Sequence, residues 1–355
     1  MGNSTNFKGE KISMKNLMVG MIYNEKYINL LTELNKEFEL TKISAVYGSI
    51  RERTLGSSRP TYRLPDVSKE EFATYVKKLN QIGVKFFYTA NAMVVGPLSA
   101  VKTRLKDIYA FVDWLREIGV NNIIVANPLY LQILRDKYPD LYLEASTIMR
   151  VRTITQIDAL IKRGINKICL DIYKNRDFNF LARAQKLAHE YGVTLEVITN
   201  EFCDWQCLDR NSCYIQHSIT EDDEHAVLKN YPMCNCIWNR STKKGNWLRT
   251  PFILPEWLDD YTELTGINHF KVTGRTGTLE FMAKILSYYL RGSECFLEDL
   301  WFHLQNIWLQ EKTMKPGLNI QSKDLKGFLN YFITRNPDCE RICKVDCNWC
   351  FDFLR

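Results

Sequence analysis

Five cysteines lie within thirty-four residues of this 355-residue chain, a density that requires a chemical explanation. They directly follow the strand-like run TLEVIT, in the segment NEFCDWQCLDRNSC and the later motif MCNC. The five are Cys203, Cys207, Cys213, Cys234 and Cys236. Thiols grouped in this way form disulfides, bind zinc or hold an iron–sulfur cluster.

The expected compartment and the spacing separate these three explanations. The amino terminus, MGNSTNFKGEKISMKN, is polar and shows no signal-peptide pattern, so we expect a cytoplasmic protein with reduced thiols. Structural zinc sites usually contain paired C-x2–4-C motifs, whereas the first three cysteines here read C-x3-C-x5-C. We therefore predict one 4Fe–4S cluster, with zinc or unliganded thiols as the alternatives. The predicted ligands are Cys203, Cys207, Cys213 and Cys236, with Cys234 the alternative to Cys236.

A second cysteine group stands near the end of the chain, in CERICKVDCNWCFDFLR. Its members, Cys339, Cys343, Cys347 and Cys350, follow the pattern C-x3-C-x3-C-x2-C. Trp349, Phe351 and Phe353 make this segment too apolar for a solvated tail. We predict a second metal centre here, an iron–sulfur cluster ahead of zinc, because four thiolates suit both. The isolated Cys169 and Cys295 are expected to be core thiols.

Composition sets broad limits on the function. Hydrophobic residues make up 46% of the chain and charged residues 25%, which is typical of a soluble globular protein without a membrane span. The net charge of +6 is spread along the chain, so it is compatible with an acidic or nucleic-acid partner and requires neither.

Short apolar runs alternate with segments of helical period, and glycine repeatedly follows the helical segments. Strands are predicted at 42–49, 84–92, 121–128, 141–147, 165–173, 193–199, 247–254 and 267–274. Helices are predicted at 15–39, 69–82, 101–118, 130–137, 155–163, 178–191, 255–264 and 279–290. This order predicts a (β/α)8 TIM-like barrel over residues 1–290, with a Cys-rich insertion after strand six and a Cys-rich extension over 291–355. No G-x-G-x-x-G follows a strand, which disfavours a dinucleotide-binding fold.

In such barrels the residues that follow each strand gather on one rim, where the chemistry takes place. The candidate catalytic residues selected by this rule are Tyr47, Arg59, Asn91, Arg150, Asp171 and Arg275. Arg59, Arg150 and Arg275 could form an anion clamp, because guanidinium groups match carboxylates and phosphates. The alternative is that these arginines brace loops or face solvent.

The second half of the barrel resembles a known family. LEVITNEFC with its spaced cysteines, followed by TPFILPEWLDDYTELTGINHFKVTGRTGTLEFMAKILSYYLRG, resembles the core of the collagenase-like peptidase family, peptidase family U32. The residues that fit its K-I-E-G-R motif and its closing Tyr-Arg are Lys271, Gly274, Arg275, Tyr289 and Arg291. Thr273 stands where the motif has Glu, and LDIYKN departs from the usual L-S-R-E-L. The resemblance covers residues 40 to 291 and is stronger in the second half.

The resemblance implies a barrel that carries a 4Fe–4S cluster on four cysteines. Several relatives are oxygen-independent hydroxylases of ubiquinone precursors, transfer RNA or ribosomal RNA, some with prephenate as oxygen donor. The resemblance therefore favours a hydroxylase-like iron–sulfur oxidoreductase. Its expected substrate is a small or anionic molecule, an RNA or a peptide. A peptidase and a non-catalytic iron–sulfur partner of another subunit are the alternatives. The sequence shows no Ser-His-Asp or Cys-His pattern for peptide cleavage, and His217 is expected to brace the cluster or face solvent.

Overall fold

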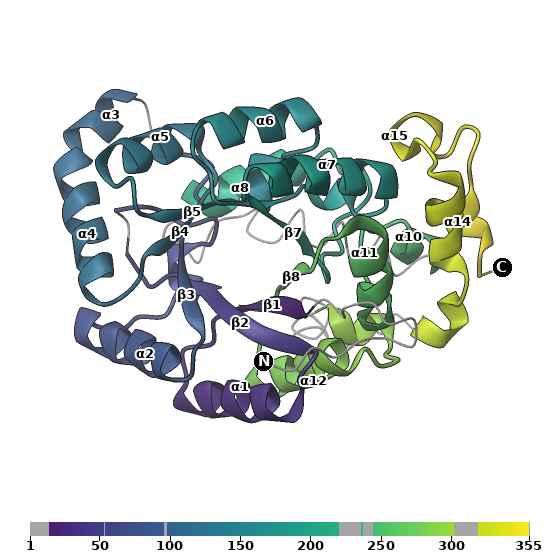
Figure 1. Cartoon of the computed structure of the whole chain (residues 1–355), viewed down its shortest axis with the longest axis horizontal. Coiled ribbons are helices and arrows are strands. Elements are labelled where there is room, and N and C mark those ends of the chain that lie inside the picture. Colours follow the sequence, from purple (N-terminus) through teal and green to yellow (C-terminus); the bar gives the residue numbers. More distant parts are fainter. Residues whose placement is uncertain are drawn as a thin grey trace.

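Eight parallel strands close into a barrel in which each strand pairs with its neighbours in sequence order (Figure 1). The computed structural model describes residues 14–52, 54–95, 98–219, 236, 244–275, 277–301 and 319–354. The strands are β1 (Lys15–Gly20), β2 (Thr41–Gly48), β3 (Lys85–Ala90), β4 (Asn122–Val125), β5 (Tyr142–Ala145), β6 (Lys167–Cys169), β7 (Thr194–Ile198) and β8 (His269–Val272). The predicted (β/α)8 barrel is thus confirmed.

Helices pack around the outside of this barrel (Figure 1). The helices that follow the strands are α1 (Glu25–Glu37), α2 (Lys69–Gln81), α4 (Leu105–Glu117), α5 (Pro128–Lys137), α6 (Ile154–Lys162), α7 (Phe178–Glu190), α11 (Leu258–Thr265) and α12 (Leu279–Arg291). Among the described residues, three further helices lie in the connections of the barrel: α3 (Leu98–Thr103), α8 (Arg210–Ile219) and α10 (Lys244–Leu248). Among the described helices, none is both long and apolar enough to cross a membrane.

The predicted order of the strands was wrong at two places. Residues 15–20, predicted as the start of a helix, form β1, and the helix begins only at Glu25. The run 247–254, predicted as the seventh strand, instead ends α10 and continues as buried chain without strand pairing. The predicted number of strands is still eight, because one strand was missed and one was predicted in error. The Cys-rich insertion consequently follows the seventh strand, β7, and not the sixth.

The interior of the barrel is divided into an apolar half and a charged half. Met18, Ala45, Tyr47, Phe87 and Ile124, from β1 to β4, form a small apolar cluster. The other half is occupied by four buried charged side chains that alternate in sign, Glu144, Lys167, Glu196 and Lys271. This half is supplied by β5 to β8.

The four charges form a closed ring of ion pairs. Lys167 lies 2.5 Å from Glu196 and 3.4 Å from Glu144, and Lys271 lies 2.9 Å from Glu196 and also contacts Glu144. The two negative carboxylates and the two positive ammonium groups give the ring no net charge. A charged group that is removed from water needs such a partner of opposite charge. The ring joins the apolar half through the two lysines, because Lys167 lies over the ring of Phe87 at 5.2 Å and Lys271 over that of Tyr47 at 4.9 Å.

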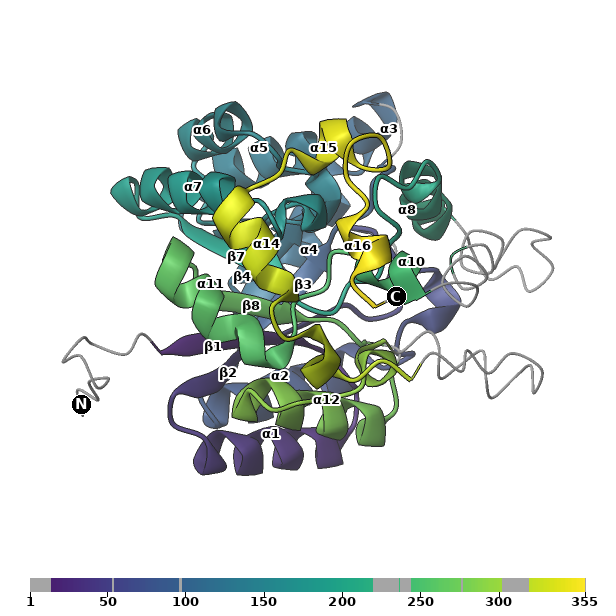
Figure 2. The ribbon, with the colours of Figure 1, turned by 90° about the vertical axis from the view of Figure 1, so that its right-hand side faces the viewer.

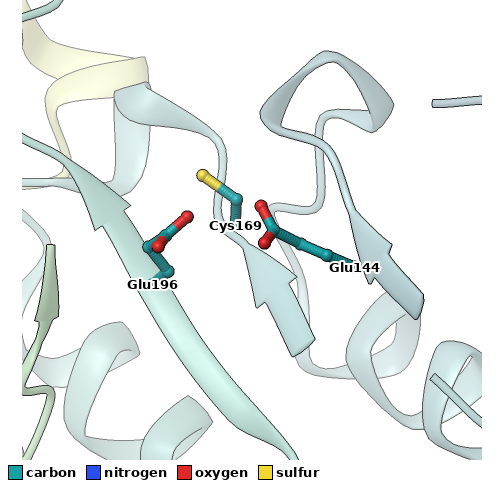
Figure 3. Close-up of side chains that lie close together, drawn as sticks. All are labelled: Glu144, Cys169 and Glu196. Atoms are coloured by element: carbon teal, nitrogen blue, oxygen red, sulfur yellow. The ribbon is translucent and has the colours of Figure 1, made fainter. Parts of the chain in front are cut away.

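Figure 3 shows Glu144, Cys169 and Glu196 pointing toward one another from neighbouring strands. Their ligand atoms lie within 4.8 Å of one another, close enough for a metal ion. Both carboxylates already contact the ammonium groups of Lys167 and Lys271, however. We therefore interpret this group as an ion-pair network of the barrel core.

The described part of the C-terminal extension packs onto the barrel wall. It contains η5 (Leu297–Leu300), η6 (Ser322–Leu325), α14 (Phe328–Arg335), α15 (Cys339–Ile342) and α16 (Trp349–Asp352). Figure 2 shows α14 crossing over α11 and α16 beside α10. Phe328, Leu329 and Phe332 belong to the same hydrophobic core as the barrel helices. The extension therefore begins after α12, near the predicted boundary at residue 290, but shares one core with the barrel.

We predict that Glu196→Gln destabilises the protein most at neutral pH. Burial alone would raise the pKa of Glu196, but Lys167 and Lys271 outweigh it and lower the pKa to about 2. This carboxylate therefore stabilises the fold above its unfolded pKa of about 4.3, and that contribution is lost as the pH falls toward 2. We expect a loss of about 3–5 kcal/mol at pH 7, measured by urea unfolding, and a smaller loss at pH 3. An equal loss at both pH values would contradict this, and Glu117→Gln, on the exposed surface of α4, is the control.

Candidate functional site

A cavity of about 280 Å³ opens where the strands of the barrel end. Eight of the residues selected from the sequence line it: Tyr47, Arg59, Asn91, Cys203, Cys207, Cys213, Cys236 and Arg275. They come from the segments that follow β2, β3, β7 and β8 and from the Cys-rich insertion. The mouth of the barrel therefore joins thiols, guanidinium groups and an amide in one space.

The four cysteines predicted as ligands converge around Cys207. Hydrogen bonds from Cys203 and Cys236 hold the pKa of Cys207 well below its usual range, so each of these two thiols contacts that of Cys207. Burial, and then the charge of Cys207, raises the pKa of Cys213 to about 11. Cys234 lies outside the described residues. The structure thus brings together the four cysteines that the sequence selected, from a loop, a helix and a distant part of the insertion.

Tyr173 fixes the loop that carries the first two thiols. Its hydroxyl oxygen lies 3.6 Å from the sulfur of Cys203, donates to the carbonyl of Asp204 at 2.8 Å and accepts the N–H of Cys207 at 3.0 Å. Its ring meets that of Trp205 edge-on, with the centroids 5.1 Å apart. One buried side chain therefore sets the conformation of the whole Cys203–Cys207 turn.

Asp171 holds the next element, α8, in place. Its buried carboxylate accepts two hydrogen bonds from Arg210, the first residue of α8, at 2.8 and 3.0 Å. Arg152 contacts it at 3.0 Å and Arg150 at 3.6 Å. Burial alone would raise the pKa of Asp171, but Arg210 and the N–H of Tyr173 lower it. Because α8 carries Cys213, the Asp171 carboxylate helps to position this thiol without lining the cavity itself.

Two predicted catalytic residues therefore have a different position from the one expected. Neither Asp171 nor Arg150 lines the cavity. Arg150 contacts Asp171 and donates to Asn211 at 2.6 Å, so it braces the cysteine loop and does not join an anion clamp. Arg210, which does line the cavity, was missed, although an arginine placed directly after a C-x3-C motif was the available signal.

The wall opposite the thiols is positively charged. Arg275 donates to Thr89 at 3.1 Å and lies over the ring of Tyr47 at 5.0 Å. Burial and the neighbouring charge of Arg275 hold the pKa of Arg59 well below its usual range. Within the described residues no carboxylate forms a salt bridge with either guanidinium group. Two half-buried cations without a carboxylate partner among the described residues favour the binding of an anion.

Two further side chains shape this wall. The side-chain oxygen of Asn91 accepts the N–H of Ser58 at 3.1 Å and so holds the loop that carries Arg59. Burial, together with Arg63 and Arg59, lowers the pKa of His217 to about 4, so this imidazole is neutral at pH 7 and only weakly basic. His217 lies on α8 and lines the same cavity. From the sequence we expected it to brace the cluster or to face solvent.

Fold and site together define a TIM-type barrel whose mouth combines a four-thiol group with a basic wall. Residues 42–197 match the family model of peptidase family U32. The matched region ends one residue before the end of β7. It therefore covers the first part of the predicted resemblance and stops before the cysteines, although the resemblance was expected to be stronger beyond them.

Two further comparisons point to the same family. An uncharacterized protease of Methanocaldococcus jannaschii is 24% identical over 331 residues, which cover 93% of this chain and 92% of the relative. A solved structure of a U32 peptidase superposes with a TM-score of 0.55 at 12% identity, and covers 76% of this chain and 96% of that one. At this identity the solved structure supports the fold alone.

We predict that Asp171→Asn destabilises the protein far more than the loss of an exposed ion pair. The change leaves the guanidinium of Arg210 buried without its carboxylate, which we expect to cost about 3–5 kcal/mol. Asp158→Asn removes an exposed pair with Lys162 on α6 and should cost less than about 0.5 kcal/mol. Chemical denaturation compares the two variants, and similar losses would show that Asp171 does not brace the site.

Proposed function

We propose that this protein is an iron–sulfur oxidoreductase, hydroxylase-like and independent of oxygen, that acts on an anionic substrate at the mouth of its barrel. One observation carries the proposal: four thiols and two guanidinium groups without carboxylate partners among the described residues line one cavity. The thiols suit a redox cluster, and the cations suit a carboxylate or phosphate of the substrate.

The spacing of the cysteines favours a cluster over a single zinc ion. Structural zinc sites usually contain paired C-x2–4-C motifs, whereas the first three cysteines here read C-x3-C-x5-C. The four thiolates of a 4Fe–4S cluster need only converge in space, because each binds a different iron.

The surroundings also fit a cluster with a net negative charge. Arg210 lies beside the thiols, and its pKa is raised by Tyr214, Asp171 and Cys203 despite its burial, so it stays charged. The hydroxyl of Tyr173 is placed to interact with the sulfur of Cys203. Positive charge and hydrogen bonds near the sulfurs are among the features that set the potential of such a cluster. When bound, a 4Fe–4S cluster supplies single-electron transfer.

The residues of the basic wall would bind and orient the substrate. Arg59 and Arg275 would hold an anionic group by paired hydrogen bonds, and Thr89 and Tyr47 keep Arg275 in place for it. His217, neutral at pH 7, could hydrogen-bond to the substrate without adding a further positive charge. The polar part of the substrate would thus be fixed on one wall while its reacting part faces the thiol side of the cavity.

Peptide hydrolysis is the second candidate, because the family name and the relative from Methanocaldococcus jannaschii both refer to proteases. A cysteine or serine peptidase needs a histidine that is oriented by a third group. Within the described residues no carboxylate bonds to His217, and its charged neighbours are arginines. The geometry therefore supports the redox proposal better.

We predict that replacing a proposed ligand removes one cluster. Cys203→Ser and Cys207→Ser should each lower the iron and the acid-labile sulfide of anaerobically purified protein by about four atoms per chain. Cys295→Ser is the matched control, because this buried thiol lies outside the cavity and should be dispensable. Retention of all iron and sulfide by Cys203→Ser would refute the assignment.

We also predict that the basic wall binds anions. Arg59→Gln and Arg275→Gln should each weaken the binding of inorganic phosphate at least about tenfold, measured by calorimetry, since each removes a charge-assisted contact of about 1.5–3 kcal/mol. Arg51→Gln is the control, because Arg51 is exposed and paired with Asp66. Equal phosphate affinity in the wild type and all three variants would contradict this role.

A further inference from the structure

The C-terminal cysteines form a second thiol group, separate from the one at the barrel mouth. Cys339, Cys343, Cys347 and Cys350 all line one small cavity of about 20 Å³. All four are free and partly buried. We propose that they bind a second metal centre, an iron–sulfur cluster, which is independent of the cluster proposed in the barrel.

The local backbone forms a tight loop that presents two of these thiols together. Cys343 and Cys347 are joined by a backbone bridge, with Lys344 donating to the carbonyl of Cys347 at 2.9 Å. Cys347 in turn donates to the carbonyl of Ile342 at 3.1 Å. The turn requires a left-handed conformation at Lys344, where φ is 66°, a conformation that is costly for a residue with a side chain. A ligand held by both cysteines would offset that cost.

The sulfur atoms do not already form a zinc site. Among the described residues no three of these four sulfurs lie within 4.8 Å of one another, whereas those of a tetrahedral zinc site lie about 3.8 Å apart. Four thiolates that line one cavity match a cluster that offers each of them a different iron.

The surroundings supply charge and hydrogen bonds of the required kind. Arg176 is buried and directs its Nη1 atom to the sulfur of Cys350 at 3.9 Å. Its other hydrogen bonds go to the carbonyls of Leu248 and Thr250, both at 2.6 Å, so in the described structure no carboxylate balances its charge. The hydroxyl of Tyr331 lies 3.2 Å from the sulfur of Cys347. A buried cation beside the thiols of Cys350 and Cys339 is expected where those thiols are ionised by a metal.

The segment 339–352, which contains α15 and α16, buries too few apolar side chains to stabilise its own structure. α15 and α16 have four residues each, no side-chain cap and no fully buried residue. They are held to α14 by aromatic contacts, with Trp349 stacked on Tyr331 at 4.7 Å. Fixing each residue of such a segment costs about 1–2 kcal/mol of conformational free energy, which these contacts alone do not recover. Metal binding supplies this free energy in many small cysteine-rich segments.

Tyr173 lies next to both cysteine groups. A second cavity, of about 60 Å³, is lined by Tyr173 and Trp205 and by Cys339, Cys343 and Cys350. Tyr173 also contacts Cys203 at the barrel mouth. The second centre would thus lie close to the first, with Tyr173 next to both.

The test compares matched double variants of the full chain, purified without oxygen. Cys343→Ser with Cys347→Ser should remove about half of the iron and sulfide of the wild type, and Cys203→Ser with Cys207→Ser should remove the other half. Full retention of metal by the tail variant would overturn the proposal. Loss of one zinc atom per chain at constant iron would also overturn it, as an iron–sulfur site. The barrel variant reports separately on the function proposed above.

A milder variant covers the case in which the double variant does not fold. Tyr331→Phe keeps all four thiols and removes only the hydroxyl beside Cys347. Because hydrogen bonds to the sulfurs raise the reduction potential of a cluster, one of the two potentials should fall while the other stays constant. Two unchanged potentials, or a single cluster that is unaffected by the change, would refute a tail cluster at this position.

Discussion

The candidate site depends on one buried ion-pair cluster, in which Asp171 binds three arginines. Arg150 and Arg152 come from the segment after β5, Asp171 follows β6, and Arg210 begins α8. The cluster therefore ties two connections of the barrel to α8, the helix that carries Cys213. Such a cluster is costly to bury and strongly directional, so it fixes geometry rather than adding much stability. Without this cluster, the segments that carry the thiols would not be held in fixed positions relative to one another.

Much of the fold follows from the sequence, because buried parallel strands read as apolar runs and helices as periodic ones. β1 was missed because its apolar run KNLMVG merges with the helical stripe that follows. The segment WLRTPFIL was mistaken for a strand because it is apolar, whereas its burial comes from packing beneath the extension. The pattern of apolar residues indicates which segments are buried. It does not indicate which of these segments pair as strands through backbone hydrogen bonds.

The four barrel cysteines were selected from spacing alone, and the structure brings these four together around one cavity. The supporting network was not predicted. Glu144, Lys167, Glu196 and Lys271 each interrupt an otherwise apolar strand, and this repeated pattern was the available signal for a charged barrel interior. The role of Asp171 was not accessible in the same way, because three arginines distant in sequence define it. Rules based on strand ends identify which residues reach the rim, and only tertiary packing decides which of them face the cavity.

The central claim is that the barrel mouth holds a redox cluster on four thiolates. The most direct measurement is the visible absorption spectrum of the wild-type chain purified without oxygen, together with its iron, sulfide and zinc content. The account predicts a brown protein with iron and acid-labile sulfide in equal amounts, whose colour fades on reduction. A colourless protein that contains stoichiometric zinc and no sulfide would contradict it.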